Sequence, residues 1–503
     1  MRLFPMNIGQ TPLRLVYASA ALVSVVLIAG CGAAYRSVIT AIGTTGPAAK
    51  VSALAVVVSS PSATSNGVVT IINYSGDSIM ATQSIGVGPL TFTIDAGGYN
   101  GYTINSDGTL NNFPVSSSLQ EKNIGYSTVG NGAEIVGLFS PKSGLWAPDL
   151  NGNVVDIFNG TSGSAQTFLQ NVPVASTPVM AIGASSPQRN FVISQGNVTS
   201  GVECNQTPTT GPLGSVTPIE ITGYTADPVI QVGICPVYAV MNSNGTRLFV
   251  LNRGSDTISV INTQDITLDA CTPFTDPQTG RTVYCHPTLP LSLTAVNNTT
   301  ITPPNGTSGM TATAGPVYAE YNSVTQQLVV ANYDGSTISI IDVSLDEYGN
   351  DSASFGTTYT VAVGNNPASV TALSDGSRAY TANQTDGTVS IVNMSSHTIE
   401  KAAVAVVGHP RSVSSVQNSE YGKVYAASPD SPYLTVLTTT TDTVDTTVLV
   451  EGNILDVRTS NQNGTAGTNN NAVSRRPGYG QPCYMPGSAA AATLTACRTM
   501  PQN

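Results

Sequence analysis

The sequence predicts an all-β protein that folds as a β-propeller of four-stranded antiparallel blades. Three observations support this prediction. Only 9% of the 503 residues are charged, so the long charged side chains that favour helices are scarce. A unit of about 40 to 50 residues recurs along the chain, as repeat architectures require. Each copy holds four strand signals separated by turn residues, which is the content of a propeller blade.

The repeat is clearest in the C-terminal half of the chain. Each copy starts at a proline, namely Pro236, Pro316, Pro367 or Pro410. The first two of these prolines begin the motif Pro-Val-Tyr-Ala. An asparagine stands sixteen residues after each of the first three prolines, at Asn252, Asn332 and Asn383. In the looser fourth copy Ser428 takes its place, eighteen residues after Pro410. This fixed spacing indicates one structural unit used several times.

Each unit divides into four expected strands. The first follows the proline, and a turn such as Asn244-Gly245, which tolerates positive φ, leads to the second. The third begins five residues after the asparagine and alternates Thr or Ser with Val or Ile, as in residues 257–261. We expect one face of this strand to point inward and the other outward. The fourth runs toward the next proline, as in residues 403–407.

A ring of blades explains the short period better than a row of sandwich domains. One four-stranded sheet cannot bury both of its faces, whereas stacked blades cover one another. An immunoglobulin-like array would need about 100 residues per unit. Counting pairs of third and fourth strands favours eight blades over seven. The N-terminal copy lacks a first strand, and residues 454–457 are expected to supply it, so that strands from both chain ends close the ring.

The three segments that end at Asn252, Asn332 and Asn383, each followed by a Thr-Ile/Val-Ser-Ile/Val strand, resemble the YVTN-type β-propeller repeat. The resemblance is close over residues 236–395 and recognisable to about residue 450. It implies a propeller fold, and seven is the commonest blade number in this family. Further blades are expected at about 89–130, 131–177 and 178–235, which places the propeller at residues 51–460.

Two insertions and a tail interrupt the pattern. The spacing from Pro236 to Pro316 is 80 residues, against 43 from Pro367 to Pro410, so the surplus at about 265–310 is interpreted as one surface loop. Residues 196–215 form a smaller insertion. Residues 461–503 turn rich in Asn, Gly and Ala, and we expect a loosely ordered, disulfide-closed tail there.

The N-terminus is interpreted as a lipoprotein signal peptide, residues 1–30, followed by a lipidated linker at 31–50. Arg2 and Arg14 precede an apolar run that is too short for a membrane span, which needs about 20 apolar residues. The run ends in Leu-Ile-Ala-Gly before Cys31, which resembles a bacterial lipobox. The resemblance implies that Cys31 becomes the lipid-carrying (palmitate) N-terminus. The residue after it is Gly32 rather than Asp, which is compatible with the outer membrane.

The other six cysteines are expected to form disulfides, because export places them in an oxidising compartment. Six cysteines allow 15 connectivities. Their spacing favours neighbours: Cys204 with Cys235, Cys271 with Cys285, and Cys483 with Cys497. A metal site would need CxxC-type spacing or nearby histidines, so no metal site is predicted from these cysteines.

No catalytic or cofactor motif stands out. The three histidines, His286, His397 and His409, lie in no metal-ligand spacing. Asp-Gly turns such as the one at Asp386 are interpreted as hairpin turns rather than calcium loops. The net charge is −11, and scattered Lys and Arg residues form no basic stripe, which argues against nucleic-acid binding. We therefore predict no cofactor, no metal and no catalytic residues.

The favoured function is a monomeric cell-envelope binding or scaffolding module, anchored through its lipid, for an unidentified protein or glycan partner. Propellers present a rigid face of loops, and the 265–310 loop is the first suspect for contacts. One alternative is an enzyme similar to sugar-lactone hydrolases that use propellers. Another is a periplasmic redox or metal-handling protein. Fold alone does not decide among them, although the lack of catalytic motifs argues against an enzyme.

Overall fold

The computed structural model describes residues 53–461 apart from short internal stretches. These stretches are 96, 131–132, 134, 136, 141–143, 161–162, 184–188, 197–212, 265–273, 276–281, 284–285, 295–299, 302–312 and 417–418. The chain divides into two units, Met1–Lys50 and Val51–Asn503, and every described residue belongs to the second. The described part contains no helix long and apolar enough to cross a membrane.

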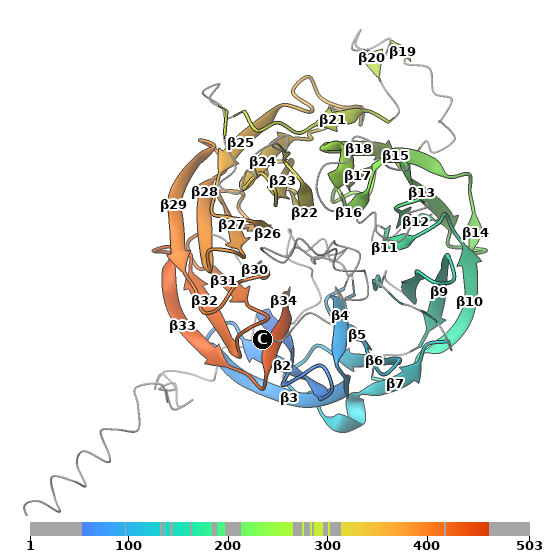
Figure 1. Cartoon of the computed structure of the whole chain (residues 1–503), viewed down its shortest axis with the longest axis vertical. Coiled ribbons are helices and arrows are strands. Elements are labelled where there is room, and N and C mark those ends of the chain that lie inside the picture. The colour runs from blue at the N-terminus through green and yellow to red at the C-terminus, as the bar shows by residue number, and fades with distance from the viewer. Residues whose placement is uncertain are drawn as a thin grey trace, which may run out of the picture. The chain divides into compact units, whose positions relative to one another are not determined.

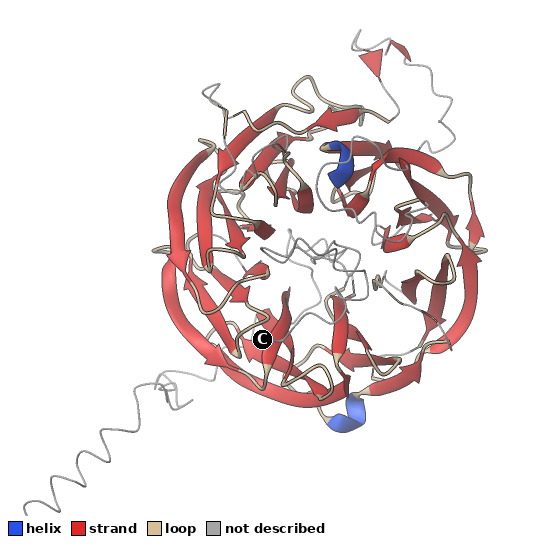
Figure 2. Cartoon of the chain, viewed as in Figure 1, coloured by secondary structure: helices blue, strands red, loops and turns tan. Residues whose placement is uncertain are grey.

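Eight blades form a ring, as the strand count favoured (Figure 1). Nearly all of the regular structure is strand, and the helical parts are two short turns, η1 (Glu121–Asn123) and η2 (Arg253–Ser255) (Figure 2). In each complete blade the first strand lies toward the centre of the ring and the fourth at its rim (Figure 1).

The first four blades hold the following strands. Blade 1 combines β34 (Asn453–Asn461) with β1 (Ala53–Ser60), β2 (Asn66–Asn73) and β3 (Ser78–Val87). Blade 2 holds β4 (Pro89–Ile94), β5 (Asn100–Asn105), β6 (Thr109–Pro114) and β7 (Gly125–Thr128). Blade 3 holds β8 (Leu145–Asp149), β9 (Val154–Asn159) and β10 (Thr167–Pro173). Blade 4 holds β11 (Pro178–Gly183), β12 (Arg189–Ser194), β13 (Leu213–Glu220), β14 (Thr225–Ala226) and β15 (Ile230–Ile234).

The other four blades follow the repeat seen in the sequence. Blade 5 holds β16 (Pro236–Met241), β17 (Arg247–Asn252), β18 (Thr257–Asn262) and β21 (Thr288–Pro290). Blade 6 holds β22 (Pro316–Asn322), β23 (Gln327–Asn332), β24 (Thr337–Asp342) and β25 (Thr358–Ala362). Blade 7 holds β26 (Pro367–Ala372), β27 (Arg378–Asn383), β28 (Thr388–Asn393) and β29 (Thr398–Ala405). Blade 8 holds β30 (Ser412–Val416), β31 (Lys423–Ala427), β32 (Tyr433–Thr438) and β33 (Thr443–Leu449).

The ring closes in blade 1, where strands from the two ends of the propeller pair. β34 runs antiparallel to β1, from Ala53 opposite Asn461 to Ser60 opposite Asn453, with one register shift. Residues 454–457 therefore supply the missing first strand, as the sequence predicted. Pairing β1 with a strand some 400 residues away in sequence places β1 inside the sheet, with β34 as the innermost strand.

The ring has two faces, which we name by their loops. The proline face carries the loop before each first strand and the loop between second and third strands, such as residues 233–236 and 252–257. The far face carries the loops between first and second and between third and fourth strands, such as residues 242–246. Because β34 ends and β1 begins at the far face, the chain enters and leaves the propeller there.

The third strands are buried on both faces, which corrects the expectation of one outward face. In β18, β24 and β28 the four central residues are all buried, although their side chains point alternately to the two faces of the sheet. The reason is tertiary, because neighbouring blades cover both faces of each sheet. The Ser of each strand is therefore a buried polar group that needs a hydrogen-bond partner.

The repeated asparagine is that partner. In blades 5, 6 and 7 its Nδ2 atom donates to the Thr and Ser hydroxyls of the third strand, and we call this arrangement the asparagine knot. The Asn–Ser distances are 2.9 Å for Asn252–Ser259, 2.9 Å for Asn332–Ser339 and 2.8 Å for Asn383–Ser390. The asparagine thus joins the second strand to the third and satisfies buried hydroxyls, a structural role.

The residue before the blade proline has a left-handed backbone in five blades: Gly88, Thr177, Cys235, Gly315 and Asn366, with φ from 52° to 61°. Its carbonyl accepts a hydrogen bond from the amide that follows the asparagine position, for example Arg253 N to Cys235 O at 3.0 Å. This bond ties the entry of each blade to its own second strand. It explains why proline and asparagine keep a constant spacing in the sequence.

The insertion expected at 265–310 is two insertions rather than one, because β21 interrupts it. β21 pairs with β18 through Thr257–Pro290, Ile258–Leu289 and Ser259–Thr288, so it is the fourth strand of blade 5. The part before β21 leaves from the far face and the part after it from the proline face. The second predicted insertion ends earlier than 215, since β13 begins at Leu213.

Candidate functional site

The contact between blades 5 and 6, which we call junction 5–6, is the strongest candidate site in the described part of the chain. β17 carries an arginine at each end, Arg247 as its first residue and Arg253 just after its last. Each arginine pairs with an aspartate of blade 6. The two long insertions of blade 5, one before β21 at the far face and one after it at the proline face, start and end beside this junction.

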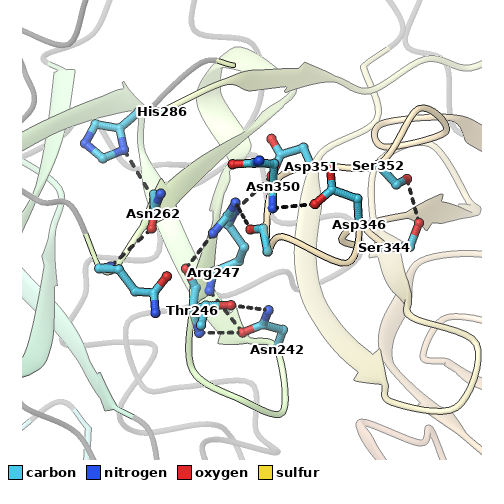
Figure 3. Close-up of polar contacts among 12 residues, drawn as sticks. Asn242, Thr246, Arg247, Asn262, His286, Ser344, Asp346, Asn350, Asp351 and Ser352 are labelled. Carbon is cyan, nitrogen blue, oxygen red and sulfur yellow. Dashed lines mark hydrogen bonds and ion pairs between the residues drawn. The ribbon is translucent and has the colours of Figure 1, made fainter. Parts of the chain in front are cut away.

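Arg247 joins the two blades at the far face (Figure 3). Its Nε donates to Asp351 Oδ1 at 2.9 Å, and its Nη2 donates to the Gly349 carbonyl at 3.0 Å. Its Nη1 donates to the Thr246 carbonyl at 3.1 Å, and the side chain is only 4% exposed. The guanidinium therefore holds a loop of blade 6 against blade 5 through charge-assisted hydrogen bonds.

Arg253 forms the matching contact at the proline face. Its Nη2 lies 2.6 Å from each oxygen of Asp334, and its Nε lies 3.1 Å from Oδ2. The guanidinium also lies 5.9 Å from the centre of the Tyr333 ring, within cation–π range. Burial lowers the pKa of Arg253, and the Asp334 carboxylate opposes this shift. The pair neutralises itself, so it orders the site rather than offering a free charge.

Asp256 fixes the start of blade 6. Its carboxylate accepts hydrogen bonds from the amides of Gly315 at 2.8 Å and Ala314 at 3.2 Å. Burial raises the pKa of Asp256, and these two bonds act against that rise. The end of the proline-face insertion is thus held by blade 5, immediately before blade 6 begins.

The other described ends of the insertions are held as well. At the proline face Thr360 Oγ1 donates to the Ser292 carbonyl at 2.9 Å. At the far face the amide of Asn262 donates to His286 Nδ1 at 3.4 Å (Figure 3). Thr263 Oγ1 donates to the Gly245 carbonyl at 2.5 Å. Both insertions therefore leave from rigid positions, a geometry suited to presenting loops to a partner.

Polar contacts continue around the proline face on both sides of the junction. Gln195 Nε2 of blade 4 donates to the Pro236 carbonyl of blade 5 at 3.1 Å. Tyr333 OH of blade 6 donates to Gln384 Oε1 of blade 7 at 3.3 Å. Burial raises the pKa of Tyr333 well above its usual value, which keeps this phenol a donor. Gln195, Tyr333 and Gln384 all directly follow the asparagine position of their blades.

The structure does not gather the three histidines. His286 lies beside Asn262 in blade 5. His397, in the β28–β29 turn, stacks on Tyr359 with ring centres 3.6 Å apart, and burial lowers its pKa. His409 is 60% exposed, and its Nδ1 lies 2.6 Å from Asp430 Oδ2. Among the described residues no three His, Cys, Asp or Glu side chains are placed to hold a metal ion.

Most of the predicted cysteine sites lie outside the described residues, namely Cys31, Cys204, Cys271, Cys285, Cys483 and Cys497. Cys235 is described: it is 3% exposed and disulfide-bonded. The β12–β13 connection that contains Cys204 begins and ends on the same face as Cys235. The proposed pairs remain predictions.

Sequence reasoning missed the charged residues of junction 5–6. Arg253 directly follows Asn252, and Asp334 follows Asn332 by two residues. Their positions next to the repeated asparagines were a usable signal, because equivalent loops of neighbouring blades meet. Asp334-Gly335 is another of the Asp-Gly turns that the sequence pattern indicates as hairpin turns, and the structure adds an ion pair between blades at Asp334.

The comparisons with known proteins identify the fold. AztD from Citrobacter koseri, solved in its apo form, matches with a TM-score of 0.51 and 11% identity, covering 82% of this chain and 98% of that one. The likeness is one of fold. A candidate 6-phosphogluconolactonase from Bacteroides fragilis matches with a TM-score of 0.47 and 13% identity, over 82% and 99% of the chains. The dihydro-heme d1 dehydrogenase NirN matches with a TM-score of 0.48 and 13% identity, over 80% and 74%. No family model and no curated protein matches the sequence.

Proposed function

We propose that the protein is an exported cell-envelope lipoprotein that binds a protein or glycan partner at the proline face of blades 4 and 5. The observation that carries this proposal is junction 5–6. Buried ion pairs at both ends of one strand reinforce the blade from which two long insertions leave. The connection between β12 and β13 leaves blade 4 at the same face. A rigid scaffold that carries long loops is the usual architecture of a binding surface.

The enzyme and metal-handling alternatives lack comparable support at junction 5–6. The Asp334 carboxylate is engaged by Arg253, and the Asp256 carboxylate is engaged by two backbone amides. A general acid or base needs a carboxyl that can reach a substrate proton. The polar groups at this junction instead order loops.

The proposed lipid anchor is connected to the propeller at the far face of blade 1, where the chain enters at Ala53. Between Cys31 and Ala53 there are 21 residues. The proposed partner surface lies on the other face, so the point of attachment does not occupy it.

Lipidation is tested separately from partner binding. We expect palmitate labelling of the wild-type protein in its native host and recovery in the membrane fraction. Cys31→Ala should lose both the label and membrane recovery while keeping the folded propeller, as judged by its β-type circular dichroism. Membrane recovery of unlabelled protein in the wild type would contradict the anchor.

Partner binding is tested with loop replacements that keep the anchoring residues. Residues 197–212 and 295–311 are replaced by short Gly-Ser linkers, with Cys235→Ser added because Cys204 is removed. We expect the loss of at least about tenfold in affinity for partners captured from envelope extracts or for glycans on an array.

The matched control replaces the far-face segment 265–285 in the same way, and Cys235→Ser is also measured alone. Both controls should keep binding. If the far-face replacement abolishes binding and the proline-face replacements do not, the proposed surface is wrong.

A further inference from the structure

Four loops on the far face each carry a large apolar side chain that stands in solvent. Tyr99 lies in the β4–β5 loop, Val324 in the β22–β23 loop, Tyr348 in the β24–β25 loop and Tyr421 in the β30–β31 loop. Their exposed fractions are 52%, 60%, 53% and 66% in the same order. These loops join first to second strands or third to fourth strands, so all of them lie on the far face. We call the four residues the far-face tips.

Exposed aromatic side chains are distributed unequally between the two faces. In the part of the chain that the structure describes, Tyr433 is exposed at the proline face, where it begins β32. The three tip tyrosines lie on the far face, and Tyr126 and Phe168 lie near it, because each is the second residue of a fourth strand. Single exposed apolar residues are ordinary, but a set gathered on one face indicates an interaction surface.

Hydrogen bonds hold each far-face tip in place. At three tips the backbone amide donates to a side chain that stands two or four residues earlier: Tyr99 N to Asp95 Oδ1 at 2.8 Å, Val324 N to Asn322 Oδ1 at 2.9 Å, and Tyr348 N to Asp346 Oδ1 at 3.0 Å. At the fourth tip the Tyr421 carbonyl accepts a hydrogen bond from the Tyr74 hydroxyl of blade 1. Because the tips are ordered in advance, binding through them costs less conformational entropy.

The positions and charges of the tips indicate what kind of partner fits them. They belong to blades 2, 6 and 8, and blades 2 and 6 lie opposite one another in a ring of eight (Figure 1). A partner that contacts all of them must be flat and as wide as the propeller, as a lipid bilayer is. The tip loops contain no Lys or Arg, and Glu347 and Glu420 stand directly before two of the tips. Zwitterionic headgroups therefore fit this face better than anionic ones.

We propose that the far face rests on a bilayer of zwitterionic lipid, with the far-face tips at the level of the headgroups. Tyrosine suits this position because its ring is apolar and its hydroxyl is polar. The chain enters the propeller at Ala53 on the same face, so the proposed anchor and the tips can act together. The proposal rests on the envelope lipoprotein function proposed above, to which it adds a second membrane contact.

The test supplies its own tether, so it does not depend on lipidation. Residues 31–503 with Cys31→Ser, which include the compact unit Val51–Asn503, carry an N-terminal histidine tag and are bound to phosphatidylcholine vesicles that contain a nickel-chelating lipid. Trp146, the single native tryptophan, is 2% exposed and provides a constant background. A second tryptophan is placed at one tip at a time: Tyr99→Trp, Tyr348→Trp or Tyr421→Trp. We expect each added tryptophan to lose fluorescence when the vesicles carry brominated acyl chains.

The matched control is Tyr433→Trp, which lies on the proline face of the same blade as Tyr421 and should keep its fluorescence on brominated vesicles. Adding Tyr99→Ser and Tyr348→Ser to the Tyr421→Trp protein should weaken the quenching, because the tips contact the bilayer together. Unquenched tips, or equal quenching of the Tyr433→Trp and Tyr421→Trp proteins, would overturn the proposal. Partner binding at the proline face is measured separately, and its failure would leave the quenching result unchanged.

Discussion

At the scale of single residues, the asparagine knot imposes a size limit on its neighbours. Glycine stands three residues before the blade proline in several copies: Gly86, Gly233 and Gly364. A Cβ added at Gly364 would lie 2.5 Å from Asn383 Nδ2, and one at Gly233 would lie 2.7 Å from the Asn252 side chain. In blade 8 the glycine is Val407 and the asparagine is Ser428. In blade 8 the smaller knot residue therefore leaves room for a side chain at the glycine position, although blade 6 combines Thr313 with Asn332.

This coupling predicts a non-additive pair of substitutions in blade 7. Gly364→Ala should destabilise the protein because its methyl group meets Asn383. Asn383→Ser should destabilise it by removing the two hydroxyl contacts. The double variant should be less destabilised than the sum, with a coupling of about 1–3 kcal/mol in denaturant unfolding. Strict additivity would contradict the idea that these two positions share one space.

The buried arginine at the proline face provides a second prediction. Arg253→Met should cost about 3–5 kcal/mol, because it leaves the Asp334 carboxylate without its partner in a site where the Asp334 side chain is 17% exposed. Combining it with Asp334→Leu should recover much of the loss. The matched control is Arg189→Met: this arginine pairs with Asp227, both side chains are 23% exposed, and the expected cost is about 0–1 kcal/mol. Equal losses for the two arginines would show that burial does not govern the effect.

At the scale of elements, basic residues at the start of three second strands join their blades to the next at the far face. Arg247 pairs with Asp351, Arg378 with Asp442, and Lys423 with Asp77. These pairs link blades 5 to 6, 7 to 8 and 8 to 1. In a chain with so few charges, these three basic residues add ion pairs to the contacts between neighbouring blades.

Asp375 links blades 7 and 8 at the same face and predicts a pH effect on stability. Its carboxylate accepts from the amide of Ser419 at 2.8 Å and from the amide of Ser377 at 3.0 Å, as well as from both hydroxyls. Burial opposes the shift, but the hydrogen bonds from Ser419 and Ser377 lower the pKa of Asp375 to about 2.

The contribution of Asp375 is therefore present above about pH 4 and is lost as the pH falls toward 2. Asp375→Asn should lower the midpoint of thermal unfolding at pH 7, and the difference from the wild type should shrink between pH 4 and 2. A difference that grows on acidification would refute the assigned role.

At the scale of the whole molecule, closure of the ring through β34 predicts the outcome of truncation. Ending the chain at Gly452 removes β34 and exposes the whole of β1, which is buried along its length. We expect this truncated protein to lose cooperative thermal unfolding and to aggregate, because a free strand edge remains. Ending the chain at Asn461 keeps the pairing of β34 with β1. This longer protein should stay monomeric in gel filtration and should keep a sharp thermal unfolding transition. Equal behaviour of the two truncations would mean that closure contributes little.

The sequence by itself determined the repeating parts of this protein. The alternation of Thr or Ser with Val or Ile, the Asn-Gly turns and the constant proline–asparagine spacing are local features, and they predicted the strands, the eight blades and closure by residues 454–457. They are readable because each copy must repeat the same backbone hydrogen bonds.

Only the tertiary structure decided what lies between the copies. The strand β21 is three residues long and is recognised by its pairing with β18, so the sequence showed one insertion where there are two. Arg247 finds Asp351 across 104 residues. The physical reason is that contacts between blades, and the burial they create, depend on how equivalent loops meet around the ring, which no local pattern encodes.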